Sequence, residues 1–185
     1  MKRELVLIIL FFVVNVAFGQ TIESKQNDSL KQKNVNLFRE IYWNNLPKAK
    51  GWINDYERVF SEAEERKLDS VVSRFERETS VEIVIVTIDT IKIAKETFDN
   101  LSLHIAKKWA IGKKGKDNGI LIALSKGYKR IRIQNGNGIT KIISDEQTKE
   151  IIEQDFIPEF KKGNYYKGVL DGINKLIEVL KLKIQ

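Results

Sequence analysis

The sequence has no cysteine among its 185 residues, and it has a single histidine, His104. Without cysteine the protein can form no disulfide, use no thiolate, hold no cysteine-ligated zinc and carry no lipid on a cysteine. Nucleophilic catalysis of the Ser-His type would need His104 as its base, but His104 falls inside a predicted helix, in no catalytic motif. Thiol chemistry is therefore excluded, and imidazole chemistry is not indicated.

Long apolar runs are also absent, except for one near the start of the chain at residues 5–14. Basic residues precede this run, and Ala17-Phe18-Gly19 places small residues where a signal peptidase cleaves. We therefore expect residues 1–19 to be a signal peptide and the mature protein to be exported, either periplasmic or secreted. An uncleaved membrane anchor is the alternative, but the run is shorter than the about 20 residues of a spanning helix.

The chain is basic and has enough apolar residues for a real core. Hydrophobic residues make up 42% of the sequence, and the formal charge is +7. Removal of residues 1–19 takes away Lys2, Arg3 and Glu4 and leaves +6. Such a balance favours anionic surfaces or phosphate-bearing ligands as partners. We expect a monomer that binds no nucleic acid.

Composition divides the remaining chain into two parts. Residues 20–50 are mostly polar and are expected to be a linker with one short amphipathic segment from Leu37 to Leu46. That segment could dock on its own domain or on a partner. The domain itself is expected to cover residues 51–183.

Within the domain, apolar spacing and capping motifs predict both helices and strands. Helices are expected after two capping boxes, Ser61 with Glu64 and Ser144 with Gln147. Pro158 should kink or shorten the second of these helices. Two further helices carry apolar stripes, and strands are expected at the β-branched run and at a short hairpin. These further elements are the stripes at 98–109 and 166–180 and the strands at 81–88, 120–124 and 130–134.

The order of these elements predicts the fold class. A strand, a helix and a second strand in succession imply a parallel pair joined by a crossover, and the hairpin adds an antiparallel strand. We therefore expect an α/β fold, a three-layer α/β/α sandwich with a small mixed sheet and helices on both faces.

The hairpin brings two glycine-rich loops, 112–119 and 135–146, to one end of the predicted sheet. Carboxylate and amide oxygens in and beside these loops are the ligands that calcium and magnesium prefer. The alternative is that Asn, Asp and Gly are simply what tight loops contain. Asp55 precedes the first helix and could reach toward these loops or stay away from them. The oxygen-bearing residues of the loops are Asp117, Asn118, Asn135, Asn137 and Asp145.

Five motifs in order resemble the TPM-domain family, over residues 51 to about 180. The resemblance implies a small exported α/β/α domain, with some members bound to calcium or other divalent ions and a plant chloroplast branch acting as acid phosphatases. It places Asp55, Asp117, Asn118 and Asp145 on polar positions of the family pattern. The motifs are WINDYERVFS at 52–61, WAIG at 109–112, KDNG at 116–119, IRI at 131–133 running into GNG at 136–138, and IPEF at 157–160 with GNY at 163–165.

One departure from the family pattern affects the expected function. Where the family commonly has Gly-Tyr-Gly-Leu-Glu, this chain has Gly-Asn-Gly-Ile-Thr at 136–140, so a carboxylate is missing. We expect a divalent cation, calcium before magnesium, held by Asp117 and Asp145 with Asn118, Asn137 and Asp55.

Two alternatives to simple cation binding stay open. One is a metal-dependent acid phosphatase, although the sequence does not identify its catalytic residues. The other is an interaction module for an envelope protein or an anionic membrane surface, suggested by the charge and by the lysines near the loops. These lysines are Lys107, Lys108, Lys113, Lys114 and Lys116.

Overall fold

The computed structural model describes residues 25–184, so the predicted signal peptide lies outside the described residues. The chain divides into two units after Asn44. The described part of the first unit is a helix over residues 25–44, which is longer than the amphipathic segment expected at 37–46. Of the helices within residues 25–184, none combines the length and the apolar character that crossing a bilayer requires.

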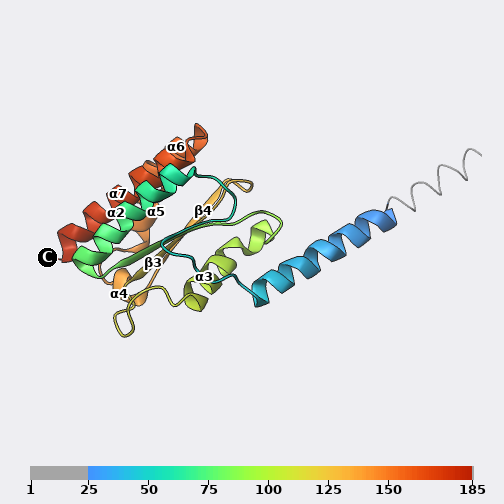
Figure 1. The fold of residues 1–185 in the computed structure, drawn as a ribbon, viewed down its shortest axis with the longest axis horizontal. Helices are drawn as coiled ribbons and strands as arrows, with labels where there is room; N and C mark the ends of the chain where they lie inside the picture. The colour runs from blue at the N-terminus through green and yellow to red at the C-terminus, as the bar shows by residue number, and fades with distance from the viewer. Residues whose placement is uncertain (1–24, 185) are drawn as a thin grey trace, which may run out of the picture. The chain divides into compact units, whose positions relative to one another are not determined.

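The second unit is built on a sheet of four strands in the order β1-β2-β3-β4 (Figure 1). The first three strands are parallel, and β4 pairs antiparallel with β3. The predicted hairpin and the mixed sheet are therefore confirmed. The strand β1 was not predicted from the sequence. The strands are β1 (Ile53–Asp55), β2 (Glu82–Thr87), β3 (Gly119–Ser125) and β4 (Arg130–Asn135).

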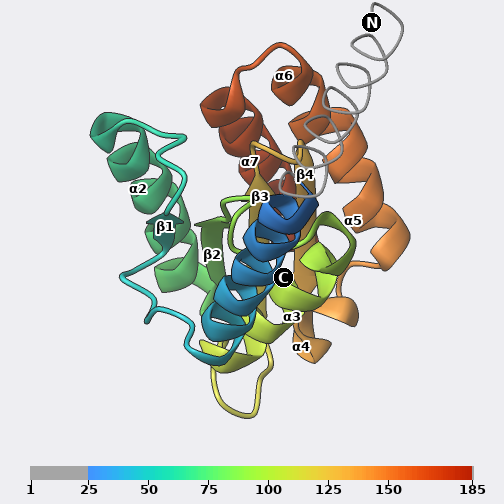
Figure 2. The same ribbon diagram turned by 90° about the vertical axis from the view of Figure 1, so that its right-hand side faces the viewer.

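Helices cover both faces of this sheet, which confirms the α/β/α sandwich. The helices α2 (Glu62–Thr79) and α7 (Tyr165–Ile184) lie side by side on one face, and α3 (Phe98–Lys108) lies on the other (Figures 1 and 2). Both predicted capping boxes are present, at the N-terminus of α2 and at that of α5 (Asp145–Ile151). The 3-10 turn η1 (Lys95–Thr97) precedes α3, and α4 (Asn137–Thr140) is a single turn after β4.

The region around Pro158 differs from a simple kink. A π-helical turn, η2 (Ile152–Phe156), follows α5 directly and leads into α6 (Ile157–Lys161), where Pro158 lies in the first turn. The backbone stays right-handed helical from α5 through η2 into α6, so Pro158 lies inside one continuous helical stretch. A proline there has no N–H to donate to the carbonyl four residues before it, and the π-helical turn directly before Pro158 is where the regular helical hydrogen-bond pattern is interrupted.

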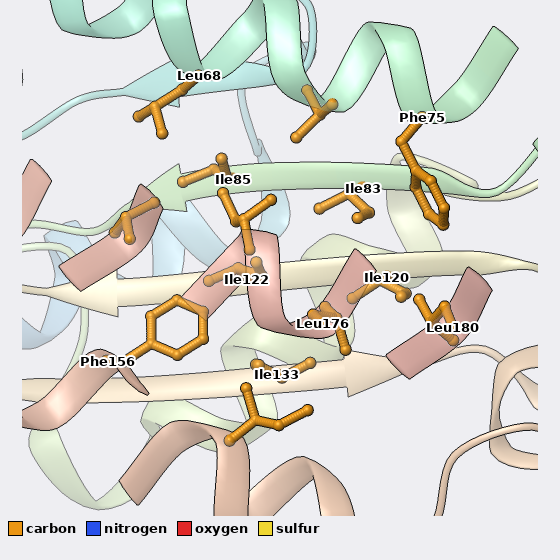
Figure 3. Close-up of a cluster of buried hydrophobic side chains, with 14 of the residues drawn as sticks. Leu68, Phe75, Ile83, Ile85, Ile120, Ile122, Ile133, Phe156, Leu176 and Leu180 are labelled. Atoms are coloured by element: carbon orange, nitrogen blue, oxygen red, sulfur yellow. The ribbon is translucent and has the colours of Figure 1, made fainter. Parts of the chain in front are cut away.

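The alternation of side chains along the strands creates two apolar layers. One face of the sheet packs against α2, α7 and Phe156 (Figure 3). The opposite face supplies the buried side chains Val84, Val86, Leu121 and Ala123, and α3 covers it. The first layer includes Leu68, Phe75, Ile83, Ile85, Ile120, Ile122, Ile133, Leu176 and Leu180 (Figure 3). The domain thus has a rigid sheet whose two ends are free to carry loops.

Candidate functional site

A hollow of about 540 Å³ lies at the end of the sheet where β3 begins and β4 ends. Its walls are the second half of α3, the loop 110–119 and the residues 134–137 that leave β4. We call it the loop hollow. Its lining residues are Leu103, Ala106, Lys107, Ala110, Ile111, Gly112, Lys113, Lys114, Asp117, Gly119, Leu121, Gln134, Asn135, Gly136 and Asn137.

The loops 112–119 and 135–146 contact each other through their backbones, as expected from the hairpin that joins their strands. The N–H of Gly138 donates to the carbonyl oxygen of Asp117 at 3.0 Å. A Cβ atom at Gly136 would lie 2.2 Å from that same oxygen, and one at Gly138 would lie 2.1 Å from the carbonyl oxygen of Lys116. Only glycine permits so close an approach. Gly136 and Gly138 therefore allow the two loops to pack closely and fix the shape of the loop hollow.

Asn118 holds the first loop in place through its side chain, which is 8% exposed. Its Oδ1 accepts from the N–H of Lys113 at 2.8 Å, and its Nδ2 donates to the carbonyl oxygen of Ser80 at 2.7 Å. The loop is thereby tied to Ser80, which caps the C-terminus of α2. The amide oxygen of Asn118 already has a partner, so the side chain acts as a brace.

Asp117 and Asn137 are the two predicted ligands that the structure brings together, since both line the loop hollow. Asp117 is exposed and has a positive φ of 49°, a backbone conformation that aspartate adopts more readily than most residues. Asn137 is exposed at the first position of α4. Both side chains are therefore available to a ligand.

Asp145 lies outside the loop hollow. It is the first residue of α5, after the N-cap Ser144, and it is exposed. It lines a separate hollow of about 530 Å³ over β4, together with Asp99, Arg132 and Lys149. Asp145 is thus not placed with Asp117 in one pocket.

Asp55 lies at the opposite end of the sheet. It pairs with Thr87 at the end of β2, whereas Gly119, beside the loop hollow, pairs with Glu82 at the start of that strand. Five residues of strand separate the two ends by about 16 Å. The Asp55 carboxylate accepts from the N–H of Phe60 at 2.7 Å and from Thr87 Oγ1 at 2.6 Å. It ties β1 to β2 and orders the turn before α2.

Glu57, an acidic residue near Asp55 in the sequence, also makes hydrogen bonds within the domain. The Glu57 carboxylate accepts from the N–H of Lys126 at 2.9 Å and so holds the hairpin turn. Burial raises the pKa of the Glu57 carboxyl above its usual value, although the hydrogen bonds from the backbone at Lys126 and Gly127 act in the opposite direction. The charges of Asp89 and Asp55 raise this pKa further.

The residues present do not fit a divalent cation. Calcium takes six to eight oxygen ligands, among which carboxylates are usual. The five predicted ligands are divided among three places, and among the described residues Asp117 is the one carboxylate that lines the loop hollow. Across residues 25–184, no group of three His, Cys, Asp or Glu side chains could hold a metal ion. Three lysines line the same hollow, and their charge opposes a bound cation.

These three lysines are not equivalent. Lys113 Nζ lies 2.8 Å from Glu76 Oε1 and 3.0 Å from Glu82 Oε1, and these two hydrogen bonds raise the pKa of Lys113. Within residues 25–184, no ion-pair partner is found for Lys107 or Lys114. Two uncompensated ammonium groups therefore face one carboxylate at the loop hollow.

Asn135 is fixed from behind. Its Nδ2 donates to Thr148 Oγ1 at 2.9 Å, and that hydroxyl donates to the carbonyl oxygen of Ser144 at 2.9 Å. Because the single hydroxyl proton of Thr148 is used on Ser144, Asn135 must present its NH₂ group to Thr148. Its Oδ1 is buried, with no hydrogen-bond partner among the described residues.

Sequence reasoning found the lysines and polar residues of this end of the sheet but missed its apolar wall. Leu103, Ala106 and Lys107 lie at helical spacing on α3 and line the loop hollow, and Ala110 and Ile111 line it just after the helix ends. The spacing of residues 103, 106 and 107 was the available signal, because these positions share one side of the helix. That side has only one large apolar residue, so the apolar pattern of the helix points to its core side instead.

Comparisons with known proteins were made at the levels of sequence and structure. A sequence model of the TPM domain matches residues 53–179. No curated protein matches the chain significantly. Among solved structures, the N-terminal domain of a P. gingivalis protein is 26% identical with a TM-score of 0.65, and the match covers 72% of this chain and 83% of that one.

Two further solved structures are less similar in sequence and show the fold alone. The BA42 protein of the psychrophilic bacterium Bizionia argentinensis is 23% identical, with a TM-score of 0.60 and coverage of 69% of this chain and 86% of that one. The N-terminal domain of a Corynebacterium glutamicum protein is 11% identical, with a TM-score of 0.53 and coverage of 76% and 84%.

Proposed function

The chain belongs to the TPM-domain family, and we propose that its domain is a binding module that holds a small anionic ligand in the loop hollow. One observation carries this proposal: Lys107 and Lys114 line the hollow without an ion-pair partner within residues 25–184. Among the described lining residues Asp117 carries the only negative charge, and Lys113 is paired with Glu76 and Glu82, which lie outside the lining. An anion in the hollow would therefore meet the ammonium groups of Lys107 and Lys114, which no ion pair within residues 25–184 occupies.

The chemistry of the lining supports binding more than catalysis. The described residues line the loop hollow with amides, glycines, lysines, one carboxylate and apolar side chains, and none of them brings a hydroxyl, thiol or imidazole group. A phosphatase reaction needs a nucleophile or a positioned water beside groups that stabilise the transition state. Asp117 alone offers a general base here. Phosphatase activity therefore stays a prediction from the sequence.

Export, calcium binding and attraction to an anionic membrane surface also stay predictions from the sequence. Calcium would meet one carboxylate and two uncompensated lysines in the loop hollow. The experiment therefore includes a separate titration with calcium. Binding of calcium and binding of an anion change in opposite directions when a charge is removed, so the two ligands can be told apart.

The test is a titration of the purified protein with inorganic phosphate at low salt, in which the NMR chemical shifts of the backbone amides are measured at each phosphate concentration. We expect saturable shifts at residues 103–119 and 134–138. The substitution Lys107→Gln should weaken binding by about threefold, the effect of one charge near a solvated site. Lys108→Gln is the matched control, because Lys108 is the next residue of the same helix and does not line the loop hollow.

Several outcomes would contradict the proposal. Phosphate shifts that do not saturate would do so, as would equal losses for Lys107→Gln and Lys108→Gln. A parallel titration with calcium chloride that saturates at residues 112–119 while phosphate does not would restore the cation prediction in its place.

A further inference from the structure

We infer that the ligand of the loop hollow is an amphiphile, an anionic group joined to an apolar one. This inference rests on the proposed function, because it adds an apolar group to the anionic ligand that the proposed function places in the hollow. It comes from an apolar wall of the same hollow, which lies beside the lysines. A bare inorganic anion would leave that wall against water.

The apolar wall is supplied mainly by α3. Leu103, Ala106 and Lys107 stand three and four residues apart along α3 and therefore lie on one side of the helix. Ala110 and Ile111 continue this wall just after the helix ends, and Leu121 of β3 also lines the hollow. An ammonium group and apolar side chains thus lie next to one another on the same side of α3.

This stripe is not needed for packing the domain. The inward side of α3 is formed by Phe98, Leu101 and Ile105, all fully buried against the sheet. Leu103 is 42% exposed, on a helix whose other large apolar side chains are covered. A single exposed leucine is ordinary on a protein surface. Here it borders a hollow of about 540 Å³, a size typical of small-molecule sites.

The arrangement fits one orientation of the ligand. The anionic group lies between Lys107 and Lys114, and the apolar group lies along Leu103, Ala106 and Ile111. The long stem of Lys107 extends the apolar surface while its ammonium group stays at the charged end. Linear alkyl carboxylates and alkyl phosphates share this chemistry, and the same two parts occur in an anionic lipid.

The experiment measures how affinity depends on chain length. The purified protein is titrated with acetate, butanoate, hexanoate and octanoate as free monomers. The NMR chemical shifts of the amides at residues 103–119 report the binding of each. Each methylene group that becomes buried should lower the dissociation constant about fourfold. Affinity should therefore rise steeply with chain length and then level off when the hollow is full.

Variants separate the two halves of the ligand. Leu103→Ser should flatten the dependence on chain length, so that octanoate gains little over acetate, and should change the affinity for inorganic phosphate much less than the affinity for octanoate. Leu182→Ser is the matched control, because Leu182 is 74% exposed on α7 and does not line the loop hollow. Both positions are exposed, so neither substitution removes a core side chain.

The outcomes distinguish this inference from the proposed function. If phosphate binds and octanoate binds no more tightly than acetate, the inference is wrong and the proposed function stands. If no anion binds, both are wrong. Co-sedimentation with anionic phosphatidylglycerol vesicles, without binding of monomeric octanoate, overturns the inference in favour of a membrane surface. Steep chain-length dependence that Leu103→Ser abolishes and Leu182→Ser retains confirms it.

Discussion

Removal of the Asn118 side chain should destabilise the domain far more than an ordinary loop substitution. Asn118→Ala deletes the hydrogen bonds of 2.8 Å from the N–H of Lys113 and of 2.7 Å to the carbonyl oxygen of Ser80, in a site that is 8% exposed. A net hydrogen bond contributes about 1 kcal/mol, and a buried polar group left unpaired costs about 1 to 3 kcal/mol. We expect a loss of about 2 to 3 kcal/mol in the free energy of unfolding.

Urea unfolding measured by circular dichroism checks this value. With a slope of about 1 to 3 kcal/mol per molar urea, the midpoint should fall by about 0.7 to 3 M. Asn137→Ala is the control, because Asn137 is exposed in the partner loop. It should change the free energy of unfolding by less than about 0.5 kcal/mol. Equal midpoints for Asn118→Ala and the natural protein would refute the role of Asn118 as a brace.

Three further predictions concern the core and the opposite end of the sheet. A Cβ atom at Gly172 would lie 2.0 Å from the Phe156 ring, so Gly172→Ala should destabilise the domain by about 1 to 3 kcal/mol in urea unfolding despite the better helix propensity of alanine. Additional replacement of Phe156 by leucine should recover part of that loss. Asp55→Ala, which removes two hydrogen bonds, should lower the thermal midpoint by several degrees and leave phosphate shifts at the loop hollow unchanged. Burial raises the pKa of Glu57 above its usual 4.5, so its contribution to stability is present below that value and is lost as pH rises through the folded pKa. Glu57→Gln should therefore gain stability relative to the natural protein between about pH 4 and about pH 7 in urea titrations, and a constant difference would contradict this.

Much of the fold was predictable because its signals are local. The capping boxes at Ser61 and Ser144 begin helices as expected, since a side chain and a backbone N–H only three residues apart decide them. The hairpin was predictable from two short apolar runs and a brief turn. In contrast, β1 has three residues, too few for any periodicity, and only its pairing with β2 makes it a strand.

The missing strand explains why the sequence left the position of Asp55 open. With β1 placed beside β2, Asp55 pairs with Thr87 and lies far from the loops. The sequence also could not show the direction of a side chain within a loop. Asp117 and Asn118 are neighbours with similar chemistry, yet Asp117 is exposed at the hollow and Asn118 is buried as a brace. Tertiary hydrogen bonds decide that difference.

The direction in which Asp117→Asn changes the affinity for inorganic phosphate tests the central claim most directly. Asp117→Asn removes the one negatively charged side chain that lines the loop hollow within residues 25–184, and it keeps a side chain of about the same size. One charge at about 6 Å in a solvated site is equivalent to about a threefold change in affinity. An anion site predicts that inorganic phosphate binds about threefold more tightly to Asp117→Asn than to the natural protein. Weaker phosphate binding to Asp117→Asn, or saturable calcium binding that Asp117→Asn abolishes, would contradict the account.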